Sequence, residues 1–483
     1  MTATTSQQTT SDTATAQNGG LGRKMKSRHL VMMSLGSAIG TGLFVGTGAG
    51  IAAAGPAVLL SFVVASTLVI LVMRMLGEMA AANPNSGAFS VYAEKAMGRT
   101  AGSTVGWLWW IQLVVVVAAE ATASAAILHT MWPVLPQWAL ALVFIAGFTA
   151  INLFGVSKFG EMEFWFAVLK IAAIVVFLAI GTALILGLLP TANSPGFSNL
   201  VGHGGFMPNG FSGIAAGLLV VIFAFGGTEI VTVAAAETEN PERNVGKAIR
   251  TVVWRILVFY IGSVLIMITV LPWNSEELGA SPFVAVLTFA GLPGMQTAMG
   301  VVIAIALLSA LNANLYGASR MIFSLSQRGR APAGLSKLSA RKVPQAAVLA
   351  SVGFGFITVV LNYLWPETVL RLLLNAVGST ILVIWGAAIV SQIILRRRAD
   401  RDPDVKLPLK MWAFPYLSYA ALAILAAIVT LAFFDPAARN QLLATSALTV
   451  GIAVWCLLRD RRKARREAAV SGAAVERNQY ESR

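Results

Sequence analysis

The chain has 483 residues, of which 57% are hydrophobic and only 12% are charged. A soluble domain usually carries about 25% charged residues, so this composition excludes an ordinary soluble protein. The net charge of +14 does not indicate nucleic-acid binding, because the basic residues lie between apolar stretches or in the C-terminal segment 459–466. The three histidines have no zinc-site spacing and no Walker-type phosphate loop is present. We therefore expect neither an enzyme nor an ATP-driven protein, with no metal or cofactor and no nucleic-acid partner.

The apolar residues are grouped in stretches of about 20, long enough to cross a hydrocarbon core of about 30 Å as helices. They do not alternate with polar residues as the strands of a membrane barrel would, so an all-α polytopic membrane protein is predicted. About twelve spanning helices are expected, at 30–53, 57–76, 102–128, 137–156, 163–189, 210–236, 251–271, 296–322, 345–364, 369–395, 413–434 and 440–458.

The basic residues predict the orientation of these helices. If the N-terminus is cytoplasmic, the external loops contain only Arg371 and Arg439 among the lysines and arginines, as the positive-inside rule requires. Both termini are then cytoplasmic and the chain lies in the plasma membrane. Residues 1–26, which are rich in Thr, Ser, Gln and Gly, are expected to form a disordered tail.

Two of the expected helices contain clustered glycines. The first carries GSAIGTG at 36–42 and the sixth carries FAFGGTE at 223–229. Each glycine weakens a helix by about 1 kcal/mol relative to alanine, which favours an unwound segment. The two segments lie five helices apart, so they predict a 5+5 inverted-repeat (LeuT-like) core with a midplane substrate site. This core would comprise residues 27–400, followed by two extra helices within 401–458 and a basic tail at 459–483. The alternative is close helix packing, for which Gly36 and Gly40 have a suitable spacing.

Several stretches resemble the amino acid–polyamine–organocation superfamily, and within it the bacterial amino acid permeases that include GABA permease and aromatic amino acid permease. They are SRHLVMMSLGSAIGTGLFVGTG (27–48), AAGPAVLLSFV (53–63), MRMLGEMAAANPNSGAFSVYAEKAMG (73–98), FGEMEFWFAVLK (159–170), GGFMPNGFSG (204–213), FAFGGTEIVTVAAAETENPERNVGKAIRTVVWR (223–255), SRMIFSLSQRGRAP (319–332) and KMWAFPYL (410–417). The resemblance covers nearly the whole chain.

The helix breaks are the expected binding site for an amino acid substrate. The N–H groups of a half-helix attract a carboxylate, and the first break offers them around Ser37, Gly40, Thr41 and Gly42. Carbonyls freed by unwinding would meet the ammonium near Ile39 and along Phe223, Ala224 and Phe225. The resemblance implies the same roles. It also implies that Phe225 caps the substrate and that Gly226, Gly227 and Thr228 make room for its side chain. Ordinary core packing is the alternative for Phe225.

Three ionisable residues lie within apolar stretches, where a charge costs roughly 3 kcal/mol or more, so each is a functional candidate. The resemblance implies that Lys170, on the fifth helix, takes the place of a coupling sodium ion and carries the proton. The alternative interpretation is that the Lys170 side chain extends to the inner membrane surface. Glu120 contacts the substrate ammonium, relays a proton, or is a neutral acid bonded to nearby backbone. Glu229 either relays protons or fixes the unwound backbone.

Polar residues on the eighth helix are further candidates. Ser309 and Asn312 are three residues apart and share a face, so they either contact the substrate or bond to neighbouring helices. Charged residues between helices, among them Glu78, Glu94 and Glu237, form either an inner gate of ion pairs or a solvated surface.

These observations predict a proton-coupled symporter of amino acids that works by alternating access. An exchanger on the same fold is the nearest alternative, and a receptor that transports nothing is disfavoured because the termini are short. GABA or a related ω-amino acid is the first expected substrate, because VLPWNS (270–275) resembles GABA permeases. LLNAVGSTILVIW (373–385) is closer to aromatic permeases, so aromatic and other neutral amino acids remain the alternative. The lipid bilayer, the substrate and protons are the only partners expected.

Overall fold

The computed structural model describes residues 27–36, 39–154, 156–190, 194, 196–238 and 241–481, and these residues form helices with short connections and no β-sheet. In chain order the helices are α2 (Ser27–Gly36), η1 (Gly42–Gly46), α3 (Thr47–Ala54), η2 (Gly55–Ala57), α4 (Val58–Ala82), α5 (Ala88–Met97), α6 (Arg99–Met131), α7 (Gln137–Phe154), α8 (Val156–Ile185), η3 (Ser198–Leu200), α9 (Gly210–Ala224), α10 (Ile230–Ala235), α11 (Pro241–Arg255), η4 (Ile256–Ile261), α12 (Gly262–Val270), α13 (Glu276–Ala280), α14 (Pro282–Phe289), α15 (Met295–Gln327), η5 (Ala333–Ser336), α16 (Gln345–Leu364), α17 (Pro366–Gly378), α18 (Thr380–Ala399), α19 (Tyr416–Ala432) and α20 (Pro436–Glu481).

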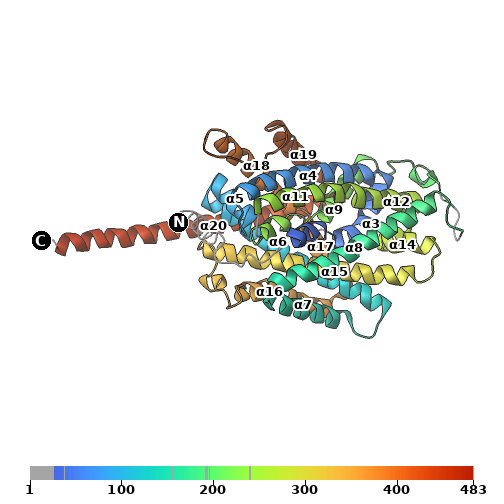
Figure 1. Ribbon diagram of the computed structural model, residues 1–483, viewed down its shortest axis with the longest axis horizontal. Helices are drawn as coiled ribbons and strands as arrows, with labels where there is room; N and C mark the ends of the chain where they lie inside the picture. The colour runs from blue at the N-terminus through green and yellow to red at the C-terminus, as the bar shows by residue number, and fades with distance from the viewer. Residues whose placement is uncertain are drawn as a thin grey trace, which may run out of the picture.

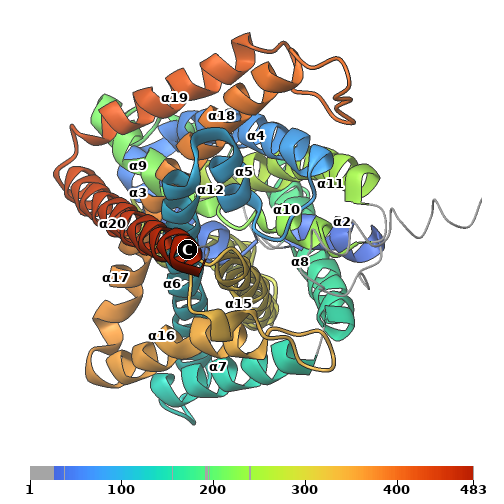
Figure 2. The same ribbon diagram turned by 90° about the vertical axis from the view of Figure 1, so that its left-hand side faces the viewer.

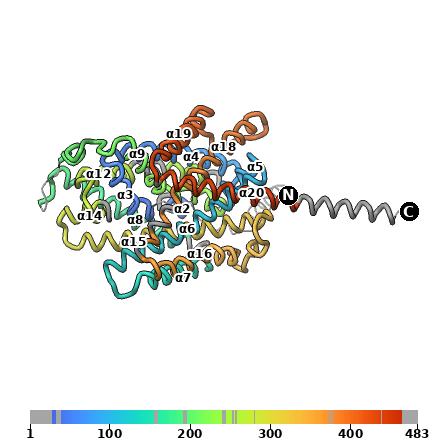
Figure 3. Tube along the Cα trace, turned by 180° about the vertical axis from the view of Figure 1, so that it is seen from behind, coloured from blue at the N-terminus to red at the C-terminus, as the bar shows by residue number. Residues whose placement is uncertain are grey.

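The long helices run roughly side by side along the molecule (Figure 1). Seen end-on, α6 and α15 occupy the middle of the bundle, with α7 and α16 along one edge and α18 and α19 along the opposite edge (Figure 2). The two central helices are mostly buried, whereas α7 and α8 leave most of their apolar surface outside the bundle. From behind, α20 runs along the bundle close to α6 (Figure 3).

Eight helical stretches in the described part of the chain are long and apolar enough to cross a membrane. They are Gly42–Ala82, Arg99–Met131, Gln137–Phe154, Gly160–Ile185, Met295–Gln327, Gln345–Leu364, Val377–Ala399 and Ala438–Lys463. Three shorter apolar helices accompany them, at Gly210–Ala224, Val258–Val270 and Tyr416–Ala432. The all-helical class is therefore confirmed. The longest stretch, of 41 residues, contains a sharp turn at Gly55, whose φ of +63° is one that glycine adopts readily.

Both glycine-rich segments interrupt helices. α2 ends at Gly36, and the helix resumes as the π-helical η1, which begins at Gly42. α9 ends at Ala224, a turn follows through Glu229, and α10 begins at Ile230. Gly227 lies in this turn with a φ of +92°, which a residue with a side chain adopts only under strain. These two interruptions position the candidate site.

Candidate functional site

The two interruptions lie directly against each other. A Cβ atom added to Gly42 would be 2.4 Å from the Cα atom of Ala224 and 3.0 Å from the carbonyl oxygen of Phe223. The first break therefore contacts the backbone of the sixth expected helix, with no room for a side chain. From the sequence we expected these residues to lie in one site, and the structure brings them together. Ser37 lies outside the described residues.

Glu120 of α6 is bonded to the first break. The Thr41 N–H lies 3.1 Å from each of its two carboxylate oxygens, and the Thr41 hydroxyl donates a hydrogen bond of 2.5 Å to Oε2. A Cβ at Gly40 would be 2.5 Å from Oε1, so glycine there lets the carboxylate reach the backbone. Glu120 thus lies at the N-terminus of the resumed helix, where an anion is stabilised by free N–H groups. Of its predicted roles, the bond to neighbouring backbone is the one present in this structure.

Lys170 of α8 is completely buried, so it does not extend to the membrane surface. Its electrostatic neighbours are the carboxylates of Glu163 and Glu120 and the guanidinium of Arg255. Glu163 is also fully buried and lies two helical turns before Lys170, on the same face of α8. A buried charge is costly unless it is paired, so these groups stabilise one another. Sequence reasoning missed Glu163, although its seven-residue spacing from Lys170 was a usable signal.

The polar residues of α15 bond to neighbouring helices. Ser309 donates a hydrogen bond of 2.8 Å to Oε1 of Glu163, and Asn312 accepts one of 2.8 Å from Asn152 of α7. The side chain of Asn312 also interacts with the carboxylate of Glu163. Ser309 and Asn312 therefore belong to the polar surroundings of Glu163 and Lys170. Their hydrogen bonds are of the interhelical kind that was one of the two roles expected for them.

The sixth-helix break has its own buried charge. Glu229 is fully buried, and its Oε2 accepts a hydrogen bond of 3.2 Å from the Thr228 hydroxyl. Arg255, at the end of α11, is 1% exposed, and its positive charge acts on Glu229. Sequence reasoning did not select Arg255, because a basic residue near the start of an expected span is typical of the inner membrane surface.

The two phenylalanines of the sixth-helix break face different surroundings. Phe225 is fully buried and stacks on Tyr260 with a ring-centroid distance of 4.7 Å, while Phe62 packs edge-on at 6.0 Å. The Tyr260 hydroxyl also donates to the carbonyl of Ala224 at 3.1 Å, one of the carbonyls expected for the ammonium. Phe225 is thus packed in the core of the bundle, and its role in capping the substrate stays a prediction.

Phe223, in contrast, packs against Val116 of α6 and Val377 of α17, in the interior next to the first break. Ile39 is fully buried. Gly226 lies beside α18, because a Cβ there would be 3.5 Å from Ile381. The apolar surroundings of Phe223 therefore come from α6 and α17.

Two of the charged residues between helices make ion pairs, one buried and one partly buried. Glu237, just after α10, pairs with Arg320 of α15 at 3.0 Å and accepts a hydrogen bond of 2.7 Å from the Tyr316 hydroxyl. Glu78 of α4 pairs with Arg396 of α18 at 2.8 Å. These pairs join segments far apart in the sequence, so they are not merely solvated surface.

An all-helical bundle with eight candidate spans and buried charges at two facing helix interruptions defines a multi-pass membrane protein with a polar centre. The family model described as amino acid permease matches residues 29–468. The chain belongs to this family, and the resemblance seen in its sequence is confirmed.

The relatives are permeases and transport proteins rather than enzymes. The chain is 49% identical to the aromatic amino acid transport protein AroP of Corynebacterium glutamicum, over 88% of this chain and 92% of the relative. It is 44% identical to the gamma-aminobutyric acid permease of Bacillus subtilis, over 94% and 96% of the two chains. It is 42% identical to the gamma-aminobutyric acid permease of Escherichia coli, over 89% and 93%.

Proposed function

We propose that the protein imports an amino acid together with protons, by alternating access across the plasma membrane. Dividing Gly42–Ala82 at Gly55 and adding the three shorter apolar helices brings the eight spans to twelve. Ten of them, within residues 27–400, form the inverted-repeat core, and the two in 401–458 lie outside it. Both termini, including the basic tail at 459–483, are cytoplasmic.

The observation that carries this proposal is the bond between Glu120 and the first break. The Thr41 N–H is a natural partner for a substrate carboxylate, but in this structure it donates to Glu120. A substrate carboxylate that approaches Thr41 is repelled by an ionised Glu120 and competes with it for the same donor. A proton on Glu120 removes the charge and weakens its hold on the amide. Proton binding therefore favours substrate binding at the same place.

Lys170 connects this site to α8. Its positive charge attracts the carboxylates of Glu120 and Glu163, and removal of one member of a buried charge group leaves the others uncompensated. The proton held by Lys170 and its carboxylate neighbours thus ties α8 to the first break. Loss of that proton removes this attraction. α8 then has two arrangements relative to the break, as alternating access requires.

The first candidate substrate is an aromatic amino acid. Phe223, Val116 and Val377 form an apolar cluster next to the break, and such a cluster suits a large apolar side chain. The aromatic amino acid transport protein with 49% identity supports the same choice.

The second candidate is GABA, which has no side chain to fill that cluster. It is supported by the gamma-aminobutyric acid permeases with 44% and 42% identity and by the VLPWNS segment at 270–275.

The test is uptake of labelled phenylalanine and labelled GABA by the purified protein in liposomes, with an inward proton gradient imposed or collapsed. We expect gradient-driven accumulation of phenylalanine that unlabelled tyrosine inhibits and GABA does not. Accumulation of GABA but not of phenylalanine would identify GABA as the substrate and leave the proposed mechanism unchanged. Uptake that does not depend on the proton gradient but requires amino acid inside the liposomes would identify an exchanger and refute proton coupling.

A further inference from the structure

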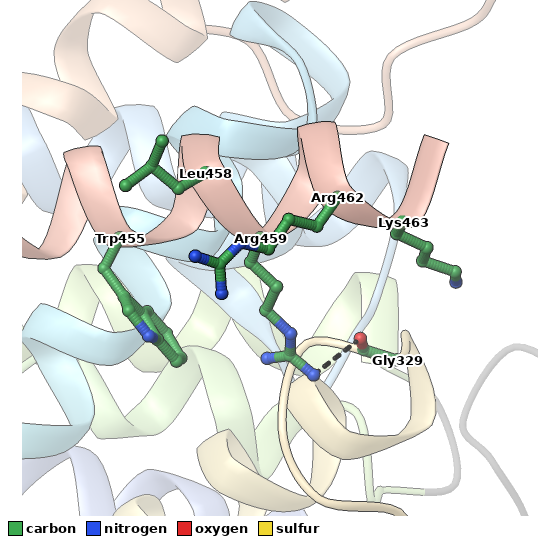
Figure 4. A pocket seen from close by; sticks show the side chains of 6 residues that line it. All are labelled: Gly329, Trp455, Leu458, Arg459, Arg462 and Lys463. Atoms are coloured by element: carbon green, nitrogen blue, oxygen red, sulfur yellow. Dashed lines mark hydrogen bonds between the residues drawn. The ribbon is translucent and has the colours of Figure 1, made fainter. Parts of the chain in front are cut away.

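Two connecting segments cross the end of the bundle at which α4, α15 and α18 finish (Figure 1). The segment after α15 is joined to α20, because Arg459 donates a hydrogen bond of 3.3 Å to the carbonyl of Gly329 (Figure 4). The segment between α18 and α19 contains residues 409–414, which we call the strap. Most of the strap lies in the KMWAFPYL stretch (410–417), which takes no part in the site described above.

Two side chains of α4, one helical turn apart, hold the backbone of the strap. Arg74 donates hydrogen bonds of 3.0 and 2.7 Å to the carbonyl of Lys410, and its guanidinium lies 4.8 Å from the ring of Trp412. Glu78 accepts a hydrogen bond from the backbone N–H of Met411. Two backbone groups of the strap are therefore satisfied by α4 rather than by water.

Glu78 also joins α4 to α18. It is 3% exposed, and its carboxylate accepts hydrogen bonds of 2.9 Å from Gln392 and 2.8 Å from Arg396. The Arg396 guanidinium in turn lies 5.2 Å from the ring of Phe414 in the strap. Three donors, one from the strap and two from α18, thus meet one carboxylate of α4. Separation of a pair that is so little exposed is costly, so Glu78 fixes the end of α18 to α4.

Leu409 extends the contact to α11. A Cβ atom added to Gly77 of α4 would lie 3.0 Å from Cδ2 of Leu409, and one added to Gly246 of α11 would lie 3.9 Å from Cδ1. Glycine at these two positions leaves room for the leucine side chain between the helices. The strap therefore contacts α4, α11 and α18 together.

α18 connects the strap to the candidate site. Near its other end, Ile381 lies 3.5 Å from a Cβ added to Gly226 of the sixth-helix break. The preceding helix, α17, contributes Val377 to the apolar cluster around Phe223. α18 is a continuous helix of 20 residues, and a rigid helix transmits a displacement from one end to the other.

We propose that the strap fixes α4 and α18 to each other throughout the transport cycle, with Glu78 as the positioning residue. The two helices then move as one body, and α18 shifts the wall of the site whenever α4 moves. This inference rests on the proposed alternating access, in which part of the bundle moves against the rest. A strap that opened in each cycle would take three donors from a buried carboxylate at once, which is costly.

The first experiment joins the two helices covalently. Ala82 and Ala399, the last residues of α4 and α18, line one cavity of about 180 Å³. Ala82→Cys/Ala399→Cys is made in a Cys456→Ala chain, which has no other cysteine, and treated with a short membrane-permeant bis-methanethiosulfonate. Uptake in liposomes is followed with labelled phenylalanine or GABA, whichever the unaltered protein accumulates. We expect the linked protein to retain uptake, and loss of uptake on linking would overturn the proposal.

Arg28→Cys/Glu161→Cys is the matched control, because these two exposed side chains form an ion pair of 2.8 Å between α2 and α8. This link should stop uptake, because α8 moves relative to the first break in the proposed mechanism. Retained uptake with this link would contradict the proposed movement of α8, whereas the strap is tested by the link between α4 and α18. The two failures are therefore distinguishable.

The second experiment weakens the strap. Glu78→Gln keeps the size of the side chain but removes the charge that pairs with Arg396, and should lower the initial rate of uptake severalfold. The link between Ala82→Cys and Ala399→Cys should restore that rate. Lys95→Gln, which removes an exposed charge from the same cavity, should leave the rate unchanged.

Two results of this second experiment would also overturn the proposal. One is an unaltered rate of uptake in Glu78→Gln. The other is a link that raises the melting temperature of Glu78→Gln without restoring its uptake, which would show that Glu78 only stabilises the fold. If Glu78→Gln does not fold, the link in the otherwise unaltered chain decides the question.

Discussion

Gly42 determines how closely the two helix breaks approach. The nearest atoms to an added Cβ are backbone atoms of Ala224 and Phe223, which cannot move aside as a flexible side chain would. We expect Gly42→Ala to lower the free energy of unfolding by about 1–3 kcal/mol, as overpacking generally does, and to abolish uptake.

Gly147→Ala is the matched control for this change. Gly147 lies on α7, and nothing would lie within 4 Å of its added Cβ. Alanine there improves the helix, so stability and uptake should be retained. Thermal unfolding in detergent and uptake in liposomes measure both effects. An active, stable Gly42→Ala protein would mean that the breaks do not need this close contact.

Phe223 and Phe225 are expected to differ in function. Phe225→Leu removes the stacking on Tyr260 and should lower the melting temperature while the preference among substrates stays the same. Phe223→Leu alters the apolar cluster with Val116 and Val377 and should reduce the preference for phenylalanine over alanine severalfold. Competition assays and thermal unfolding on both variants separate the two effects. A shift in preference caused by Phe225→Leu alone would return the capping role to Phe225.

Single residues were predictable from the sequence where their chemistry is unusual for their surroundings. Glu120, Lys170 and Glu229 stood out because charges are rare in apolar stretches, and all three are buried. The contact partners did not stand out, because Thr41 and Glu120 are 79 residues apart and Ser309 and Glu163 are 146 apart. Such pairs depend on how helices pack, which composition and spacing do not determine.

At the level of helices, the breaks were predictable because glycine clusters weaken a helix wherever they occur. The π-helical turns η1 (Gly42–Gly46) and η4 (Ile256–Ile261) were not predicted. A π-turn accommodates one extra residue in a helix and is favoured by tertiary contacts, frequently near functional sites. The bend at Gly55 between two expected spans, by contrast, follows from the Gly-Pro sequence at 55–56.

The ion pair between Glu237 and Arg320 joins the end of α10 to α15. Both side chains are at most 2% exposed, so loss of either one leaves a buried charge without its partner. We expect Arg320→Gln to lower the free energy of unfolding by about 3–5 kcal/mol. The double variant Glu237→Gln/Arg320→Gln should recover part of that loss.

The exposed pair between Arg28 and Glu161 provides the control, because these side chains are 52% and 45% exposed. Arg28→Gln should cost less than about 1 kcal/mol. Thermal unfolding of all three variants gives the comparison. Equal losses for Arg320→Gln and Arg28→Gln would show that the buried pair does not hold α10 to α15.

For the whole molecule, we expect proton binding on Glu120 to favour substrate binding at the first break. Glu120 joins α6 to the first break, and Lys170 and Glu163 bring α8 to the same centre. Two long helices, α6 and α8, thus meet the first break at one group of buried charges. A change of charge there alters the packing of all three, which a rocking bundle requires.

The most direct test is proton movement that accompanies substrate, measured with a pH-sensitive dye inside liposomes at equal internal and external pH. Addition of external phenylalanine should acidify the interior with the unaltered protein. Lys170→Ala and Glu120→Gln should abolish this acidification, and Glu120→Gln should retain exchange of labelled for unlabelled phenylalanine. Uptake of phenylalanine by the unaltered protein without any acidification would contradict the account.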